Sequence, residues 1–241
     1  MAGHSKWANI KHKKERADSK KGKIFSRCAK EIISAVKMGG PDFRSNSRLR
    51  LAIEKARVEN VPNDVIDRNI KKASNADQAD YFELTYELYG HGGVGIVVDI
   101  MTDNKNRIAS DIRIATNKRG GNVANPGAVA YNFERKGIIQ ISKKTPLSED
   151  ELFHIAIDAG AEDFEADEEL FLVTTDPINL FQVKEAIEKQ GIKCENTSLE
   201  MIPKVFVDCD EETLKSNLAL IEWLEDIDDV DSVYHNMNLP D

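Results

Sequence analysis

Residues 90–95 read Gly-His-Gly-Gly-Val-Gly, the G-x-G-x-x-G pattern of loops that hold dinucleotide phosphates on backbone N–H groups. Such a loop must join a strand to a helix, because the phosphate is bound at the helix N-terminus. The flanking segments here, 82–89 and 94–101, have the apolar patterns of β-strands. The nearest suitable acid, Asp111, falls inside the next predicted helix and not at a strand end. The motif therefore predicts a hairpin turn, and we expect no nucleotide cofactor.

Candidate nucleophiles and metal ligands are few and scattered. The three cysteines, Cys28, Cys194 and Cys209, and the five histidines form neither a C-x-x-C nor an H-x-x-x-H pattern, so the sequence predicts no metal site. Cys28 lies on the apolar side of a predicted helix, which favours an inert buried thiol. A disulfide between Cys194 and Cys209 fits their spacing alone, but an odd number of scattered cysteines is typical of a reducing cytoplasm. Carboxylates occur throughout and identify no acid–base pair, so we expect no catalytic residues and no enzyme.

The N-terminal part of the chain has the chemistry of a phosphate-binding segment. Residues 1–75 contain 19 Lys and Arg against 8 Asp and Glu, a net charge of +11, whereas residues 76–241 carry a net charge of −20. A basic end on an acidic body indicates a polyanionic partner for that end; the alternative is that the two ends attract each other. Residues 1–22 contain few apolar side chains, so they predict an arm that is mobile while unbound.

The expected nucleic-acid contacts follow from this charge. Lysines act as point charges for phosphate, and the arm contains one arginine, so we expect affinity more than sequence readout. Trp7 either stacks on an unpaired base, worth about 1–3 kcal/mol, or anchors the arm against the first helix. Arginines of the next segment either extend the basic track or form a solvated helix face. The predicted contacts are Lys6, Trp7, Lys11, His12, Lys13, Lys14, Arg16, Lys20, Lys21, Lys23, Arg48 and Arg50.

The elements that position these residues begin with a helical bundle at 23–75. Helical spacing from Lys23 ends at Gly39-Gly40, a second helix fits 47–59, and Pro62 suits the first turn of a third. The polar segment 74–80 predicts a linker. No helix-turn-helix emerges, because the second and third helices lack a turn glycine and their basic residues are spread over several faces.

The rest of the chain predicts two α/β domains, at 80–136 plus 204–241 and at 137–203. The first begins with the hairpin and a helix at 105–119, followed by a loop, a short strand at 130–133 and a turn at 134–137. The second has strands at 138–142, 163–166, 169–175 and 192–201, and its helices run from the Ser148/Glu151 capping box to Ala159 and from Pro177 to Gln190. This β-α-β-β-α-β sequence is the ferredoxin-like order.

The C-terminal segment is expected to return to the first α/β sheet. It contains a predicted strand at 205–209, a helix at 211–225 and a strand at 230–235, which could complete the sheet begun at 82–101. The third domain would then be inserted in the second. The fold class is α+β: a basic arm and three-helix bundle, followed by two ferredoxin-like α/β domains.

Motifs along the chain resemble those of the YebC family, which includes the mitochondrial translational activator of cytochrome c oxidase subunit I. They are MAGHSKWANIKHKK, KGKIF, RLRLAIEKA, VPNDVIDRNIKKA, YELYGHGGVGIVVD, TDNKNR and FERKG. The resemblance covers nearly the whole chain and is loose after about residue 140. It implies a helical N-terminal domain, two related α/β domains and a non-enzymatic role in gene expression. Members are commonly labelled DNA-binding transcriptional regulators. Others act on translation at the ribosome, where they help protein synthesis through difficult stretches such as consecutive prolines.

Two departures from the family pattern lie in the second domain. The family usually has proline where this chain has His91, and a GGNLG-like segment where Asn122-Val123-Ala124-Asn125-Pro126 stands here. The predicted role of the N-terminal arm does not depend on either position.

The leading functional hypothesis is a regulator of gene expression that binds phosphate through the arm and the helical domain. We favour a translation factor acting at ribosomal RNA, because an acidic body suits a partner touched at one end; the alternative is a DNA-binding transcriptional regulator. A module that binds proteins is the second class and an enzyme the third. No apolar run reaches the roughly 20 residues of a membrane span and no secretory signal is evident, so we expect a cytoplasmic protein. The sequence leaves the oligomeric state open, and we favour a monomer.

Overall fold

The computed structural model describes residues 6, 8–12, 21–73, 81–167 and 169–239. They belong to two compact units. The first comprises Met1–Ile53, Val61–Glu134 and Ile202–Asp241, and the second comprises Glu54–Asn60 and Arg135–Met201. The linker predicted at 74–80 lies outside the described residues.

Three helices follow the N-terminal segment: α2 (Lys21–Gly39), α3 (Ser47–Val58) and α4 (Asn63–Ala73). The apolar face of α2 buries Cys28 and Ile32, and α3 buries Leu49. The Asn46 side chain connects the two helices: its amide donates to Ala35 O (2.8 Å) and Gly40 O (2.9 Å), while its oxygen accepts from Leu49 N (3.0 Å). One asparagine thus joins carbonyls near the end of α2 to an N–H in the first turn of α3 that α3 cannot satisfy itself.

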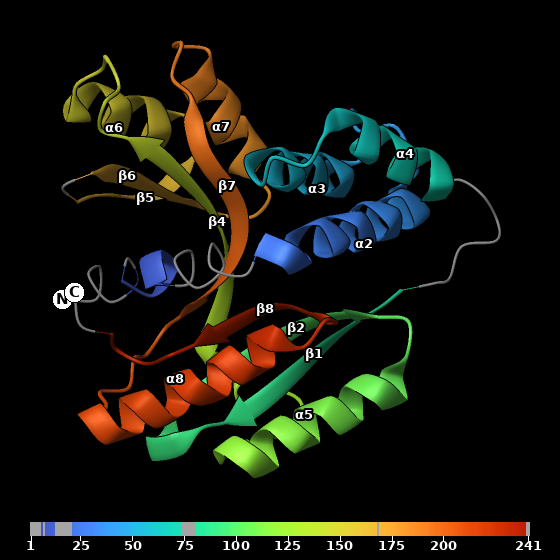
Figure 1. Cartoon of the computed structure of the whole chain (residues 1–241). Helices are drawn as coiled ribbons and strands as arrows, with labels where there is room; N and C mark the ends of the chain where they lie inside the picture. The colour runs from blue at the N-terminus through green and yellow to red at the C-terminus, as the bar shows by residue number, and fades with distance from the viewer. Residues whose placement is uncertain (1–5, 7, 13–20, 74–80, 168, 240–241) are drawn as a thin grey trace. The chain divides into compact units, whose positions relative to one another are not determined.

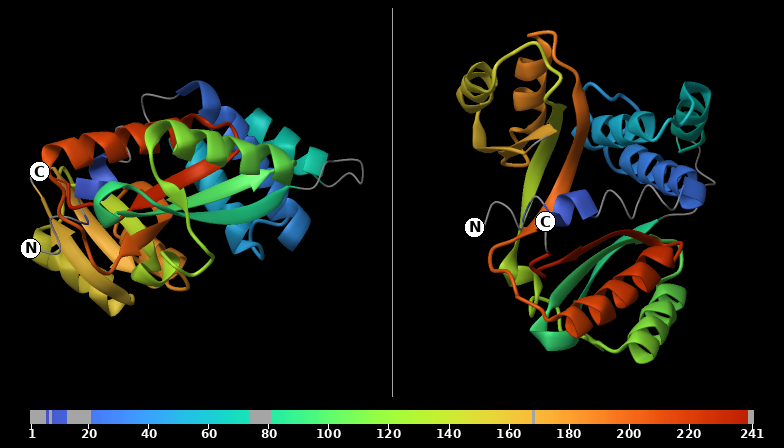
Figure 2. Two further views of the ribbon diagram at one scale, coloured as in Figure 1. Left: turned by 90° about the horizontal axis from the view of Figure 1, so that it is seen from below. Right: turned by 60° about the vertical axis from the view of Figure 1, so that its left-hand side comes forward.

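The sheet of the first unit has the order β3-β1-β2-β8. Its strands are β1 (Phe82–Tyr89), β2 (Gly95–Thr102), β3 (Asn122–Val123) and β8 (Val230–His235). Two helices, α5 (Lys105–Arg119) and α8 (Glu211–Asp226), lie side by side on one face of this sheet (Figures 1 and 2). Ile108 and Ile112 of α5 and Leu220 of α8 pack with strand residues in one fully buried core.

The glycine-rich motif is the turn of a β-hairpin, as its strand-like flanks indicate. β1 and β2 are antiparallel, and their register closes at Tyr89 opposite Gly95. A short 3₁₀ turn, η1 (His91–Gly93), connects them, with Gly92 and Gly93 at φ 66° and 81°. Glycine adopts these left-handed conformations without the steric cost that a Cβ imposes.

The sheet of the second unit has the order β5-β6-β4-β7. Its elements are β4 (Phe133–Ser142), α6 (Glu149–Asp158), β5 (Ala161–Ala166), β6 (Leu170–Thr175), α7 (Leu180–Glu188) and β7 (Cys194–Pro203). Both helices lie on one side of the sheet (Figure 1). The predicted capping box at the start of α6 is present: Ser148 Oγ accepts from Glu151 N, and the Glu151 carboxylate accepts from Ser148 N.

The two sheets have the same spatial arrangement but different chain order. β6 lies between β4 and β5, and β1 lies between β2 and β3 in the same way; β7 and β8 complete the outer sides. In the second unit, β6 comes after the first strand–helix–strand unit, β4-α6-β5, in the chain. In the first unit, β1 comes before the corresponding unit, β2-α5-β3. Since β8 pairs with β2 after the chain has built the second sheet, the predicted insertion of the third domain in the second is confirmed.

Four predicted boundaries are wrong. Residues 130–132 form a 3₁₀ turn, η2, instead of a strand, because the Glu87 carboxylate holds the backbone N–H groups of Val129 and Ala130. The segment 134–137 continues β4, since Gly137 pairs with Thr175. Only one isolated bridge, Val207 to Met237, forms in 205–209. Helix α7 begins at Leu180 because Asp176 holds residues 177–179 in a turn.

Part of the predicted mobile arm is attached to the first sheet. Residues 8–12 are helical, and Ala8 and Ile10 are buried. The Asn9 amide donates to His235 O (3.3 Å) and Met237 O (3.0 Å), just beyond β8. Burial of these apolar side chains outweighs the ordering entropy for this short stretch. No helix in the described part of the chain is long and apolar enough to cross a membrane.

Candidate nucleic-acid interface

The TDNKNR motif, residues 102–107, forms a polar cluster at the junction of β2 and α5. The Asn104 side chain caps α5 by accepting from Asn106 N and Arg107 N, both at 3.1 Å. Thr102 Oγ1 donates to Asp229 Oδ2 (2.9 Å), and Arg107 Nε donates to the same oxygen (3.1 Å). Arg107 also pairs with Asp103 (2.7 Å). The motif therefore fixes the start of α5 against the turn before β8.

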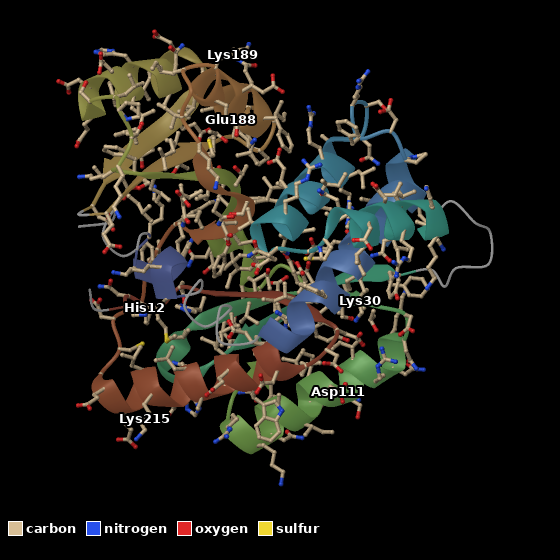
Figure 3. All side chains as sticks on the ribbon, turned by 45° about the horizontal axis from the view of Figure 1, so that its top comes forward. His12, Lys30, Asp111, Glu188, Lys189 and Lys215 are labelled. Carbon is tan, nitrogen blue, oxygen red and sulfur yellow. The ribbon has the colours of Figure 1, made fainter. Side chains whose placement is uncertain are left out.

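Asp229 connects this cluster to the helical segment. Lys30 of α2 donates from Nζ to Asp229 Oδ1 at 2.8 Å, and the Asp229 side chain is 4% exposed. Burial acts to raise the pKa of Asp229, but hydrogen bonds from Lys30, Arg107 and Thr102 outweigh it and hold the pKa below its usual value. Because each cation is engaged by this carboxylate, we assign Lys30 and Arg107 to intramolecular structure and not to phosphate binding. Lys30 is labelled on α2 in Figure 3.

The predicted contact residues fall into three groups. Trp7, Lys13, Lys14, Arg16 and Lys20 lie outside the described residues, so the two interpretations of Trp7 remain predictions. Lys21 and Lys23 lie in the first turn of α2. The others are described with their side chains: Lys6, Lys11, His12, Arg48 and Arg50.

The described contact residues differ in how accessible they are. Lys6 is 9% exposed, so a phosphate cannot reach it without local rearrangement. Arg48 makes an ion pair with Glu83 of β1 and donates to Met38 Sδ (3.2 Å). His12 and Arg50 are partly buried, and Lys11 is exposed on the short N-terminal helix. The structure thus favours Lys11 over Lys6 and Arg48 as a phosphate contact.

The sequence did not reveal which basic residues make hydrogen bonds or ion pairs within the fold. Arg27 of α2 donates to Glu225 O at 2.7 Å, which closes the helical segment onto α8. Side-chain contacts of this kind join residues about 200 positions apart, so no local pattern could reveal them. Within the first-unit part of residues 1–75, four basic side chains are exposed and have no charged partner among the described residues. They are Lys11, Arg44, Lys71 and Lys72.

A cleft of about 310 Å³ lies between α5 and the end of α8 in the first unit. It is lined by Arg107, Asp111, Ile114, Trp223, Asp226, Ile227, Asp228 and Asp229. Four carboxylates face this space, and its single arginine already pairs with Asp103 and Asp229. Such a cleft repels phosphate, so any phosphate contact belongs elsewhere on the unit.

The cysteines and histidines that the structure describes form no converging site. All three thiols are free in the structure. Burial raises the pKa of Cys194 to about 12, so this thiol is not an activated nucleophile. His235 is buried, and its Nδ1 accepts from Met237 N at 3.3 Å. Among the described residues no group of three His, Cys, Asp or Glu side chains could hold a metal ion.

Two family models match the chain. The model of the TACO1/YebC protein N-terminal domain matches residues 5–76, and that of the TACO1/YebC second and third domain matches residues 81–237. The chain belongs to the TACO1/YebC family.

Relatives within this family are similar over their whole length. A probable transcriptional regulatory protein of Protochlamydia amoebophila is 69% identical over 241 residues, which cover 100% of this chain and 98% of the relative. One of Chlamydia trachomatis serovar L2 is 63% identical over 98% of this chain and 100% of its own. The crystal structure of a conserved hypothetical protein from Aquifex aeolicus is 41% identical, with a TM-score of 0.82 over 93% of each chain.

The YebC departure at His91 has a structural counterpart. The His91 backbone N–H donates to Asn217 Oδ1 (2.8 Å), and the Asn217 amide donates back to His91 O (3.1 Å). The imidazole Nε2 lies 2.8 Å from Arg119 O at the end of α5. A proline here would have neither a backbone N–H nor an imidazole nitrogen. It could make only the bond that its carbonyl accepts from Asn217, whereas His91 also ties the turn to Asn217 Oδ1 and to the end of α5.

The second YebC departure, at 122–126, leads into a loop that one acid holds in place. Glu87 of β1 is 8% exposed, and its carboxylate accepts from Gly127 N (2.6 Å), Val129 N (2.6 Å) and Ala130 N (2.7 Å). Burial acts to raise the pKa of Glu87, but these three backbone donors outweigh it and lower the pKa. An acid on a strand gives no sign in the sequence that it will fold a loop about 40 residues later.

Proposed function

We propose that this protein is a non-enzymatic regulator of gene expression that binds nucleic-acid phosphate through its N-terminal arm and helical domain. The separation of charge carries the proposal, because residues 1–75 have a net charge of +11 and residues 76–241 a net charge of −20. Phosphate binding by Lys and Arg supplies most of the sequence-independent affinity of nucleic-acid-binding proteins. The relatives named as probable transcriptional regulatory proteins support a regulatory role.

The exposed basic residues refine which side chains bind phosphate. Lys11 lies on the N-terminal helix, Arg44 in the turn after α2, and Lys71 and Lys72 in the last turn of α4. Each has its charge in solvent, so binding to phosphate releases counterions without first breaking an internal ion pair. Together with the arm lysines at 13, 14, 20, 21 and 23, they form the proposed phosphate-binding set.

The target that the physical argument favours is structured RNA, with ribosomal RNA as the specific case. Four carboxylates line the cleft of the first unit, and a long duplex wrapped around such a body would be repelled. A partner engaged at one end of the molecule avoids that repulsion. The names of the relatives favour the second candidate, a DNA-binding transcriptional regulator.

Binding of a labelled RNA hairpin and a labelled DNA duplex at several salt concentrations tests the phosphate-binding set. Replacing Lys11, Lys71 and Lys72 together with alanine should weaken binding to every sequence by a similar factor, because phosphate contacts carry no base code. The log–log salt slope should become shallower by about 1 for each lysine that no longer binds a phosphate. The matched control replaces Lys144, Lys189 and Lys193 with alanine, three exposed lysines of the second unit. Equal weakening in both variants would remove the helical domain from the proposal.

Sedimentation of the cellular protein with ribosomes distinguishes the two targets. We expect co-migration that nuclease treatment abolishes. Enrichment on promoter fragments without ribosome association would replace the translation proposal by the transcriptional one. Retention on ribosomes after deletion of residues 1–22 and nuclease treatment would instead support a module that binds proteins.

A further inference from the structure

One flank of α6 in the second unit carries two partly exposed apolar side chains. The inward face of the helix buries Leu152 and Ala156 completely. About 100° around the helix from these residues, Phe153 is 41% exposed and Ile157 37% exposed, one helical turn apart. The Phe153 ring makes an edge contact with Phe164 of β5, with ring centroids 5.8 Å apart. Asp150 and Asp158 are exposed near the two ends of this apolar flank. The flank therefore keeps apolar area in solvent beyond the contact with Phe164.

An exposed isoleucine from a later connection lies near the C-terminal end of α6. Ile178 is 89% exposed, and the turn that carries it is fixed by a hydrogen bond from its own N–H to Asp176 Oδ1 (2.9 Å). The turn lies at the end of α6, because the Gln182 amide donates to Ala159 O at 2.9 Å. Holding a large aliphatic side chain in water costs free energy that its burial against a partner would recover.

The segment that carries these apolar residues contains only acidic charge, although Lys143 pairs with Glu149 at 3.9 Å and Lys136 of β4 pairs with Glu162 at 2.8 Å. Residues 145–183, which include α6 and the Ile178 turn, contain eleven Asp and Glu and no Lys or Arg. Asp150 and Asp158 have no ion-pair partner in the part of the chain that the structure describes. Phosphate would be repelled by this surface, so it does not extend the proposed nucleic-acid interface.

We propose that Phe153, Ile157 and Ile178 form a docking surface for a basic amphipathic segment of another protein. Apolar side chains of the partner cover the three residues, and its lysines or arginines lie against Asp150 and Asp158. Charge complementarity selects this occupant, because an acidic or neutral apolar segment would leave the carboxylates without partners. The surface is small, so the interaction is weak and transient and its electrostatic part is sensitive to salt. This surface is independent of the phosphate-binding set.

Fluorescence anisotropy with a labelled lysine–leucine amphipathic peptide tests the proposal on the full chain. The peptide should bind at low salt, and a glutamate–leucine peptide of the same pattern should not. Ile178→Ser, a change at a fully hydrated side chain, should weaken binding by about tenfold. Asp150→Asn with Asp158→Asn should weaken it by several-fold at low salt and have no effect at high salt.

The control is Glu211→Gln with Glu212→Gln, which removes the same charge from exposed positions of α8 in the other unit. This variant should bind the basic peptide like the unchanged protein. Equal binding of both peptides, or equal weakening in the two charge variants, would show general attraction to an acidic protein and overturn the proposal. Concentration-dependent self-association that Ile178→Ser removes, without an effect on peptide binding, would assign the surface to a second copy of the chain instead.

Discussion

Asp229 is the single residue whose loss should affect the most elements. It is 4% exposed and accepts from Lys30, Arg107 and Thr102, so Asp229→Asn removes the counter-charge of the mostly buried Lys30 and one of the two carboxylates that pair with Arg107. We expect the free energy of unfolding to fall by about 2–3 kcal/mol, measured by urea denaturation. Asp64→Asn, at a 71% exposed position paired with Arg68, should change it by less than about 1 kcal/mol.

The pH dependence of the stability of Asp229→Asn tests the role of this carboxylate a second time. The pKa of Asp229 is lowered by folding, so its contribution is complete above the unfolded value of about 3.8 and is lost as the pH falls through the folded pKa. The difference in stability between the unchanged protein and Asp229→Asn should therefore be constant near neutral pH and narrow below about pH 4. A difference that grows on acidification would contradict the assignment.

His91 should behave as half of a pair with Asn217. His91→Pro removes the N–H that Asn217 Oδ1 accepts, and Asn217 is completely buried, so an oxygen is left without its donor. We expect the free energy of unfolding to fall by about 1–3 kcal/mol. Adding Asn217→Ala should cost less than the sum of the single changes, because both partners are then absent. Additive effects in a double-mutant cycle would show that the pair is not coupled.

At the scale of elements, the stability of α5 depends on Asn104, the residue that caps its N-terminus. Asn104→Ala removes the acceptor for two backbone N–H groups and should lower the free energy of unfolding by about 1 kcal/mol, whereas Asn104→Asp should keep nearly all of it. Thermal denaturation of the three proteins measures both effects. Equal destabilisation of the alanine and aspartate variants would show that the cap does not hold the start of this helix.

The sequence predicted correctly those elements whose residues follow a local apolar pattern. Periodicity located α2 and α8, and the β-branched flanks of residues 90–95 identified the hairpin. The misassigned segments depend on distant partners: 130–132 is set by Glu87, and 205–209 by a bridge to Met237. The same limit applies to the site, because composition revealed the basic region but not that Arg48 pairs with Glu83 or that Lys6 is buried.

At the scale of the whole molecule, the basic and the acidic parts of the chain are proposed to bind different partners. The proposed phosphate-binding residues lie within 1–75, while the acidic stretch 145–183 is proposed to meet a basic protein segment. A ribonucleoprotein offers both kinds of surface, whereas naked DNA offers one. The two proposals are separable, since each has variants that leave the other surface unchanged.

Binding of the full chain and of a form lacking residues 1–22 to RNA, as a function of salt, tests the central proposal most directly. We predict that the full chain binds at low ionic strength with a steep log–log salt slope, near −4 if about six phosphates of a single strand are neutralised. The truncated form should bind far more weakly and with a shallower slope. Equal affinity and equal slope for the two forms, or no binding by either to RNA or DNA, would contradict the account.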